Sequence, residues 1–222
     1  MNLARYGAAV LTFALLPITV LGAAPAVPSP SIDTVAGTTV LQQLDSAASL
    51  AGVTLVVRAG LDRQTMKQNG VAALVAETIM KTPVALRQAQ GDMPAMPLED
   101  AVAARGGSVR FTVDPGDVRF YAEALPGDAP AVLELLRAAI AAPDFSAATV
   151  RAARTALTQE IAASQQVALQ VGLDMLNAAS SPQANTGLPE LGTPASLSDL
   201  FSGDASAFYR AYYRRGGVLV SA

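Results

Sequence analysis

Hydrophobic residues recur along this chain with two different periods, one typical of strands and the other typical of helices. Short runs rich in β-branched and apolar residues predict strands over 38–44, 52–58, 108–113, 118–125 and 217–221. Apolar residues repeated every three or four positions predict helices over 70–80, 98–105, 129–142, 146–164, 168–179 and 205–213. Strands and helices in this order predict an α+β fold, with helices packed on a mixed sheet.

Some of these segments carry further detail. The helix at 70–80 is apolar almost all round, which predicts that it is buried. The strands 108–113 and 118–125 flank Asp114, Pro115 and Gly116, so we expect a hairpin there. Glycine and proline in 88–97 predict a loop, and a second loop rich in Ser, Pro and Gly follows 168–179.

Composition narrows the function classes. A chain of 222 residues is long enough for one domain with its own core, and 51% hydrophobic with 5% aromatic residues predicts a core of Ala, Val and Leu. The net charge of −3 argues against a nucleic-acid partner. A cluster of aromatic and basic residues at the last helix is better explained by packing of that helix than by nucleic-acid binding. It comprises Tyr209, Tyr212, Tyr213, Arg210, Arg214 and Arg215. The absence of cysteine excludes disulfides and thiolate chemistry, and the chain also has no histidine.

The N-terminus has the features of a signal peptide. Arg5 precedes an apolar run over 8–22, and small residues follow, with cleavage expected after Ala23 or Ala26. The alternative is a membrane anchor, but the run is shorter than the ~20 apolar residues that a span needs. No cysteine follows, which argues against a lipoprotein. We therefore expect a periplasmic or secreted protein, divided into a signal peptide at 1–26, a flexible mature N-terminus at 27–37 and a domain at 38–222.

One segment carries a resemblance to a known family. Residues 69–83 read NGVAALVAETIMKTP, similar to the helix that bears the inverted zinc motif H-x-x-E-H in pitrilysin- and insulinase-type metallopeptidases, GLAHFLEHMLFKGT. In this alignment the two metal-binding histidines fall on Ala73 and Glu77, and the catalytic glutamate falls on Ala76. Zinc hydrolysis needs imidazoles for the metal and a carboxylate for its water, and alanine supplies neither.

The resemblance continues in the same order along the chain. Residues 98–125 resemble the family's helix, Gly-Gly turn and hairpin, and 145–164 resemble the helix with the third zinc ligand, which here is Glu160. Arg154 matches the family arginine, whereas Ala153 replaces a glutamate. FYRAYYRRGGVLVSA at 208–222 resembles the last helix and strand. The resemblance implies an N-terminal half-domain over 38–222, with a mixed, largely antiparallel sheet and helices on one face.

The resemblance also identifies a substrate-binding edge strand. In active relatives it reads N-A-x-T, and here Arg110 replaces the asparagine and Phe111 the alanine. The expected substrate strand comprises Ser108, Val109, Arg110, Phe111, Thr112 and Val113. Arg110 would either be a solvated edge charge that discourages aggregation or grip an acidic peptide.

These observations favour a catalytically silent, exported subunit or half of a pitrilysin/insulinase-like peptidase, without catalytic residues or metal of its own. Zinc is expected only in a partner, either a zinc-bearing subunit of the same family or a second copy, with a peptide as substrate and no membrane span in the mature chain. One alternative is a metal-dependent endopeptidase that uses Glu77 and Glu160 with magnesium, calcium or manganese. Otherwise Glu160 would bond locally or pair with an arginine, and Glu77 would reach solvent at the cleft mouth. A purely structural relative and a truncated gene that lacks a second half are further alternatives.

Overall fold

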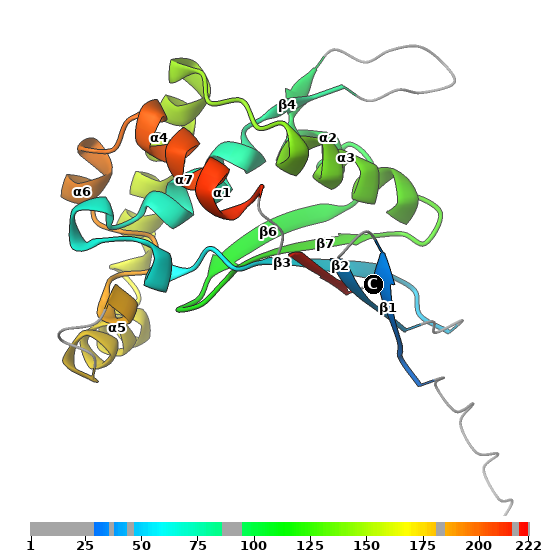
Figure 1. Cartoon of the computed structure of the whole chain (residues 1–222), viewed down its shortest axis with the longest axis horizontal. Helices are drawn as coiled ribbons and strands as arrows, with labels where there is room; N and C mark the ends of the chain where they lie inside the picture. Colours follow the sequence, from blue (N-terminus) through cyan, green and yellow to red (C-terminus); the bar gives the residue numbers. More distant parts are fainter. Residues whose placement is uncertain are drawn as a thin grey trace, which may run out of the picture.

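A six-stranded sheet forms one layer of the protein, and most helices lie over one of its faces (Figure 1). This computed structural model describes residues 29–35, 38–43, 47–85, 95–180, 185–214 and 218–221. The strands are β1 Ser31–Val35, β2 Thr38–Gln42, β3 Ala51–Val57, β6 Ser108–Val113, β7 Val118–Ala124 and β8 Val218–Ser221. They lie in the order β1-β2-β8-β3-β7-β6. Only β2 and β8 are parallel neighbours, so the sheet is mixed and largely antiparallel, as predicted.

Buried and more exposed side chains alternate along the central strands β3 and β7, so one face of the sheet packs against the core. In β3, Val53, Leu55 and Val57 are buried, and in β7 the buried set begins with Val118 and Phe120. Leu55 pairs with Phe120, so the two strands turn their apolar side chains to the same face. This period of two is the signature of a sheet with one face on the core.

The helices form the second layer. They are α1 Val71–Met80, α2 Leu98–Ala103, α3 Ala129–Ala141, α4 Ala147–Ser164, α5 Ala168–Ser180, α6 Pro194–Ser198 and α7 Ser202–Tyr212. Three short 3-10 helices are η1 Leu61–Arg63, η2 Met66–Gln68 and η3 Asn185–Gly187, and a small second sheet pairs β4 Pro83–Val84 with β5 Met96–Pro97. Every residue of α1 is buried. The predicted burial of this helix is therefore confirmed.

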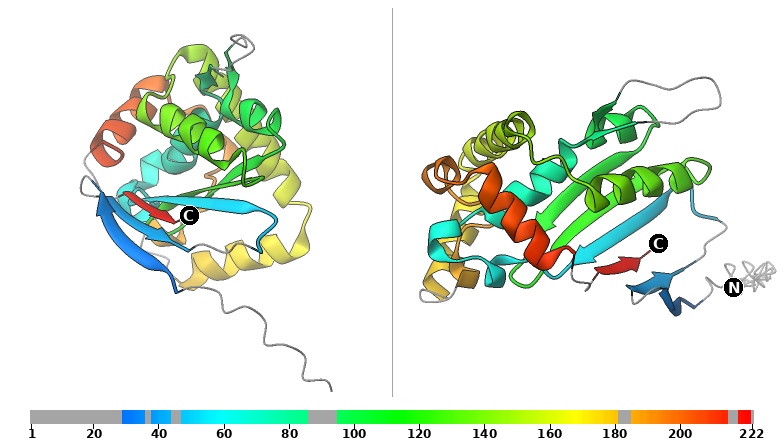
Figure 2. Two further views of the ribbon diagram at one scale, coloured as in Figure 1. Left: turned by 90° about the vertical axis from the view of Figure 1, so that its right-hand side faces the viewer. Right: turned by 45° about the horizontal axis from the view of Figure 1, so that its top comes forward.

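Helix α5 is the exception to the layered arrangement. None of its residues is buried, and it lies at one end of the molecule, below the level of the other helices in Figure 1. Seen from the opposite end of the molecule, it lies lower than the sheet and on the far side (Figure 2, left). Across the described residues, no helix is both long enough and apolar enough to cross a membrane.

Three predicted boundaries need correction. Ser31–Val35, which we assigned to a flexible N-terminus, forms β1 because it pairs along its whole length with β2. The end of the predicted loop at 88–97 forms β5. The Ser/Pro/Gly-rich loop contains α6, because Thr193 and Ser196 form a capping box and Pro194 begins the helix. The predicted signal peptide lies outside the described residues.

Candidate functional site

The helix that resembles the zinc-motif helix begins at a sharp turn. Gly70 precedes α1 in the left-handed conformation, with φ of +89°. The helix then places Ala73, Ala76 and Glu77 at i, i+3 and i+4, which is one face. Ala73 and Ala76 are completely buried, and Glu77 is 7% exposed. The face that would hold a metal is therefore closed by packing.

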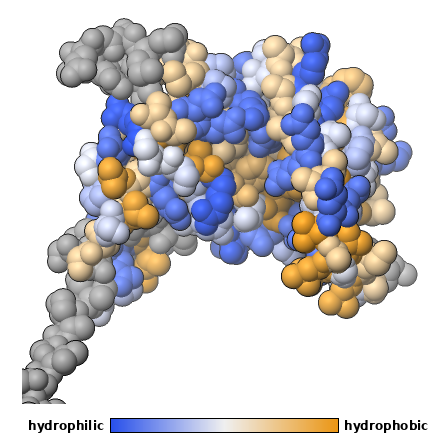
Figure 3. Space-filling model, turned by 180° about the vertical axis from the view of Figure 1, so that it is seen from behind, coloured by the Kyte–Doolittle hydropathy of each residue, from blue (hydrophilic) through white to orange (hydrophobic). Residues whose placement is uncertain are grey.

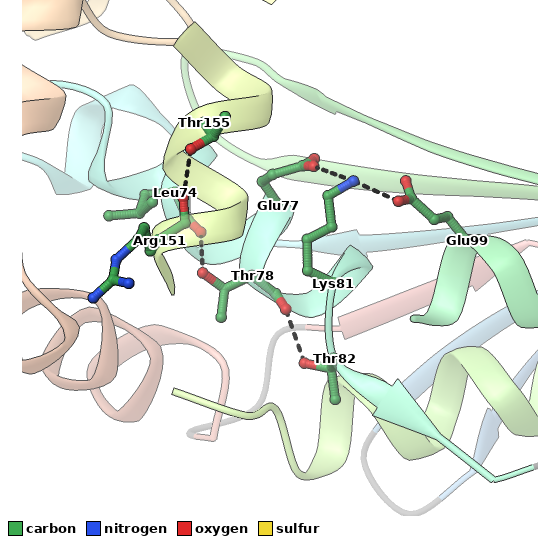
Figure 4. Close-up of polar contacts among 8 residues, drawn as sticks. All are labelled: Leu74, Glu77, Thr78, Lys81, Thr82, Glu99, Arg151 and Thr155. Carbon is green, nitrogen blue, oxygen red and sulfur yellow. Dashed lines mark hydrogen bonds and ion pairs between the residues drawn. The ribbon is translucent and has the colours of Figure 1, made fainter. Parts of the chain in front are cut away.

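Glu77 has a partner that the sequence analysis did not assign. Its Oε1 lies 3.4 Å from the Nζ of Lys81, one turn later on the helix. Lys81 also donates a hydrogen bond to Glu99 at the start of α2 (Figure 4). The expectation that Glu77 reaches solvent at a cleft mouth is wrong, because every residue of α1 is buried and Glu77 is only 7% exposed. The i, i+4 spacing of Glu and Lys was a sequence signal for this pair.

Burial dominates the ionisation of Glu77. Desolvation raises the pKa of this carboxyl to about 7, although the charge and hydrogen bond of Lys81 lower it. The negative charges of Glu99 and Glu160 add to the rise. Burial lowers the pKa of Lys81, but the hydrogen bond to Glu99 and the charge of Glu77 outweigh it, so the net shift is upward. The cation that pairs with Glu77 is therefore the Lys81 ammonium group, a side chain of this protein, rather than a metal ion.

Glu160, the remnant ligand position on α4, is near enough to Glu77 for its charge to raise the pKa of that carboxyl, and it also borders a cavity. It is exposed and lines a cavity of about 360 Å³ that Phe111, Thr112 and Val113 of β6 also line. The rest of the wall comes from the end of α4, from α5 and from the loop 189–194. Within the described residues the Glu160 carboxylate makes no hydrogen bond or ion pair. Neither the local hydrogen bond nor the pair with an arginine that we considered is present there.

The cavity is acidic. Asp174 and Glu190 lie on its wall together with Glu160. Desolvation, followed by the charges of Asp114 and Asp174, raises the pKa of the Glu190 carboxyl. Among the described residues, no three His, Cys, Asp or Glu side chains are grouped so that they could hold a metal. The cavity offers carboxylates and an apolar floor beside a strand edge, which suits a side chain of an extended segment better than an ion.

Strand β6 is the outermost strand on its side of the sheet, as expected for a substrate strand. Val109 and Phe111 pack against the core, and Phe111 contacts Phe120 with ring centroids 6.3 Å apart. Ser108, Arg110 and Thr112 are the exposed alternate positions. The Arg110 guanidinium lies 4.8 Å from the Tyr121 ring centroid and 3.5 Å from Glu123. Arg110 thus contacts β7, and with 59% of its side chain exposed it is also a solvated edge charge.

Arg154 and Tyr209 hold elements of the fold together through hydrogen bonds to backbone carbonyls. Arg154, the matched family arginine, donates to the carbonyl of Leu200 and thereby ties α4 to the chain after α6. The Tyr209 hydroxyl donates to the carbonyl of Ile140 at 2.7 Å, and Tyr213 is buried. These contacts confirm that the tyrosines of the aromatic and basic cluster pack against helices.

Comparison with known proteins agrees with this arrangement. The family model described as Insulinase (Peptidase family M16) matches residues 39–193. Among solved structures, pitrilysin superimposes with a TM-score of 0.69 at 20% identity, over 83% of this chain and 20% of its own. A protease from Helicobacter pylori gives 0.73 at 14% identity, over 88% of this chain and 46% of its own. No curated protein matches the sequence.

A third similar structure is a peptidase M16 inactive domain from Pseudomonas fluorescens, with a TM-score of 0.70 at 15% identity, over 87% of this chain and 46% of its own. This chain thus spans about half the length of two of these relatives and about a fifth of pitrilysin. At these identities the likeness concerns the fold.

Proposed function

This chain belongs to the insulinase family, peptidase family M16, and from that premise we propose that it is a catalytically silent half of a peptidase. In this proposal the protein is exported and binds peptide together with a zinc-bearing partner of the same family. Its own role is to complete the chamber and hold the substrate rather than to hydrolyse it.

The state of the α1 face is the observation that carries this proposal. The family places metal ligands and a general base where this chain has Ala73, Ala76 and Glu77. Both alanines are sealed from solvent, and the glutamate faces Lys81. These residues do not fit catalytic zinc, which needs three Cys, His or acidic ligands and one open position, because two of the three positions are alanine. Similarity to an M16 inactive domain supports the same view.

Peptide binding is proposed at the free edge of β6. An exposed edge strand can accept an extended segment through main-chain hydrogen bonds, with pockets for alternate side chains. The acidic cavity beside Thr112 and Val113 would receive one such side chain. The signal-peptide features of 1–26 support export to the periplasm or the medium.

The alternative of a metal-dependent endopeptidase is less well supported. It needs Glu77 and Glu160 to face a common ion. Instead Glu77 is turned to Lys81, while Glu160 lines the cavity beside β6.

The experiment is a reconstitution. The protein and a histidine-bearing M16 relative from the same host are purified separately and then mixed. We expect this protein alone to hold no stoichiometric zinc and to cleave no peptide, and the mixture to have a higher kcat/KM than the relative alone. One tightly held zinc in this protein, removable with loss of its own proteolysis, would overturn the proposal.

Variants locate the peptide site. Thr112→Trp should fill the cavity beside β6 and weaken binding of a labelled peptide measured by fluorescence anisotropy. Thr158→Trp, on the exposed surface of α4 outside the cavity, is the matched control and should bind like the native protein. Unchanged peptide binding in Thr112→Trp would show that the peptide does not bind at β6. The proposal that the protein is catalytically silent would then be tested only by the zinc measurement.

A further inference from the structure

Helix α5 exposes its apolar side. Leu169, Leu173 and Leu176 are 73%, 44% and 62% exposed. Met175, about 100° further round the helix from Leu176, is 70% exposed. Figure 3 shows hydrophobic surface gathered at the lower right of the molecule, the end at which α5 lies. An amphipathic helix of a globular protein normally turns this face to the core. Patches of a few hundred Å² or more commonly mark interaction sites.

The polar side of the same helix faces the body of the protein. Gln170 and Asp174 line the cavity beside β6, and the Gln170 amide donates to the Asp174 carboxylate at 2.9 Å. At 100° per residue, Asp174 lies about 130° round the helix from the centre of the leucine face, and Gln170 lies at the border of that face. The leucine face is therefore turned outward by the way in which α5 attaches.

The leucine face is self-complementary. Steps of four and then three residues separate Leu169, Leu173 and Leu176, which is the spacing of a coiled-coil seam. The flanking positions carry Gln170, Gly172, Asn177 and Ala179, none of them charged. In coiled coils charged flanks select the partner. Uncharged flanks permit an identical helix to pack against this one without repulsion.

A lipid surface fits this helix poorly. Helices that lie on membranes carry Lys or Arg on their polar face, for contact with anionic lipids. The one charged residue of α5 is Asp174, and the sequence contains no Lys or Arg between Arg154 and Arg210. Glu160 and Glu190 add negative charge on the cavity side. Electrostatics thus favours a protein partner over an anionic bilayer.

We propose that the leucine face of α5 is the interface between two copies of this chain, which pack α5 against α5 about a two-fold axis. Such a contact is isologous, since the same patch serves both subunits. A helix of 13 residues is about 20 Å long. One such pair buries less than the ~1,600 Å² of a standard interface, so the dimer should be concentration-dependent. The inference does not depend on the proposed function, because none of the three leucines lines the β6 cavity.

Sedimentation velocity tests the proposal. The native protein should shift from monomer to dimer as its concentration rises through the micromolar range. Combined Leu169→Gln, Leu173→Gln and Leu176→Gln should abolish the shift. Their folding should persist, because none of the three is buried, and circular dichroism checks it. Leu50→Gln, Met66→Gln and Leu125→Gln, three exposed apolar residues elsewhere, form the matched control and should dimerise normally. A native protein that stays monomeric, or equal effects of the two triple variants, would overturn the proposal.

Cross-linking gives an independent measurement, because the chain has no cysteine of its own. A short bis-maleimide should join two copies of Leu173→Cys and should fail with Met66→Cys. Equal cross-linking of both variants would contradict an α5 interface. Co-sedimentation with phosphatidylglycerol vesicles tests whether the leucine face binds a lipid surface instead of a second copy. Binding that the leucine-to-glutamine variant loses would overturn the dimer in favour of a lipid surface.

Discussion

Gly70 and Gly192 lie back to back where the cavity wall meets the start of α1. Both have positive φ, +89° and +82°. A Cβ on Gly192 would stand 2.8 Å from the Cα of Gly70, closer than real Cβ contacts allow. Only glycine meets both requirements at once, since its lack of a Cβ permits the left-handed region and the close approach. The pair fixes the loop 189–194 against the helix.

Gly192→Ala should therefore lower the free energy of unfolding by at least about 1–3 kcal/mol, the cost of a strained backbone residue. Urea unfolding measures it. Gly203→Ala is the matched control, because a Cβ there meets nothing within 4 Å and the residue lies in a helix. Its effect should be small, since alanine is the better helix former. Similar losses in both variants would show that the glycine contact is not the cause.

Glu77 should make stability depend on pH. A carboxyl whose pKa rises from 4.5 to about 7 on folding keeps its proton in the folded protein across that window and loses it in the unfolded chain. The free energy of unfolding therefore falls as the pH rises from about 4.5 to 7. Above this window the cost is on the order of 3 kcal/mol.

Glu77→Gln removes this titration. Relative to the variant, the native protein should lose stability between about pH 4.5 and 7, as measured by denaturant unfolding at several pH values. Glu134→Gln, at an exposed ion pair with Arg137, is the control and should follow the native profile. Parallel profiles for native protein and Glu77→Gln would mean that Lys81 already compensates for burial.

Restoring the motif tests the alignment of α1 with α4. Combined Ala73→His, Ala76→Glu and Glu77→His should give measurable zinc binding by titration calorimetry, but little hydrolysis, because Arg110 and Phe111 still replace the substrate-contacting pair. Both alanines are fully buried, so overpacking should cost about 1–3 kcal/mol. Adding Glu160→Gln should weaken the gained affinity. A folded triple variant without any gain would show that Glu160 is wrongly aligned.

Helices α3 and α7 are joined by one hydroxyl. Tyr209 donates to the carbonyls of Ile140 and Ala141, at 2.7 and 3.0 Å, where α3 ends. Helix ends leave carbonyls without partners, and the single hydroxyl proton of Tyr209 is shared between two of them. Tyr209→Phe should cost about 0.5–1.5 kcal/mol in thermal or urea unfolding, because the hydrogen bond between α7 and the end of α3 is lost. Tyr212→Phe is the control, since its hydroxyl makes no hydrogen bond in the described part of the chain. Equal losses would assign the effect to ring packing.

The elements with strong local signals could be predicted from the sequence, and those that depend on distant partners could not. The hairpin β6–β7 and the buried α1 follow from alternation, turn residues and apolar content. Strand β1 exists because β2 pairs with it, and nothing within Ser31–Val35 specifies that pairing. The sequence of α5 gives an amphipathic helix but not the direction in which its leucines point. The i, i+4 spacing of Glu77 and Lys81 was a local signal for their ion pair, but the burial that raises the pKa of Glu77 depends on the surrounding fold.

The buried apolar residues that the structure describes form one core, to which some helices contribute many residues and α5 contributes none. The buried residues of α1, α4 and the sheet belong to one cluster that runs through most of the fold. Helix α5 contributes nothing to this cluster. A chain that spans about half the length of two relatives thus holds a closed core together with one helix that has no apolar cover of its own.

Hydrogen exchange should reveal this division. Amides of α1 can exchange only when the core opens, which costs a large part of the global stability of about 5–15 kcal/mol. Amides of α5 need only local opening, whose free energy approaches zero for a helix without buried contacts. At low protein concentration we expect α5 to exchange at least ~100-fold faster than α1, because each 1.4 kcal/mol of difference is a factor of ten. Raising the concentration should slow α5 and leave α1 unchanged, because a second copy covers the leucine face. Equal protection of the two helices in the dilute monomer would mean that α5 packs onto the body of the protein in solution.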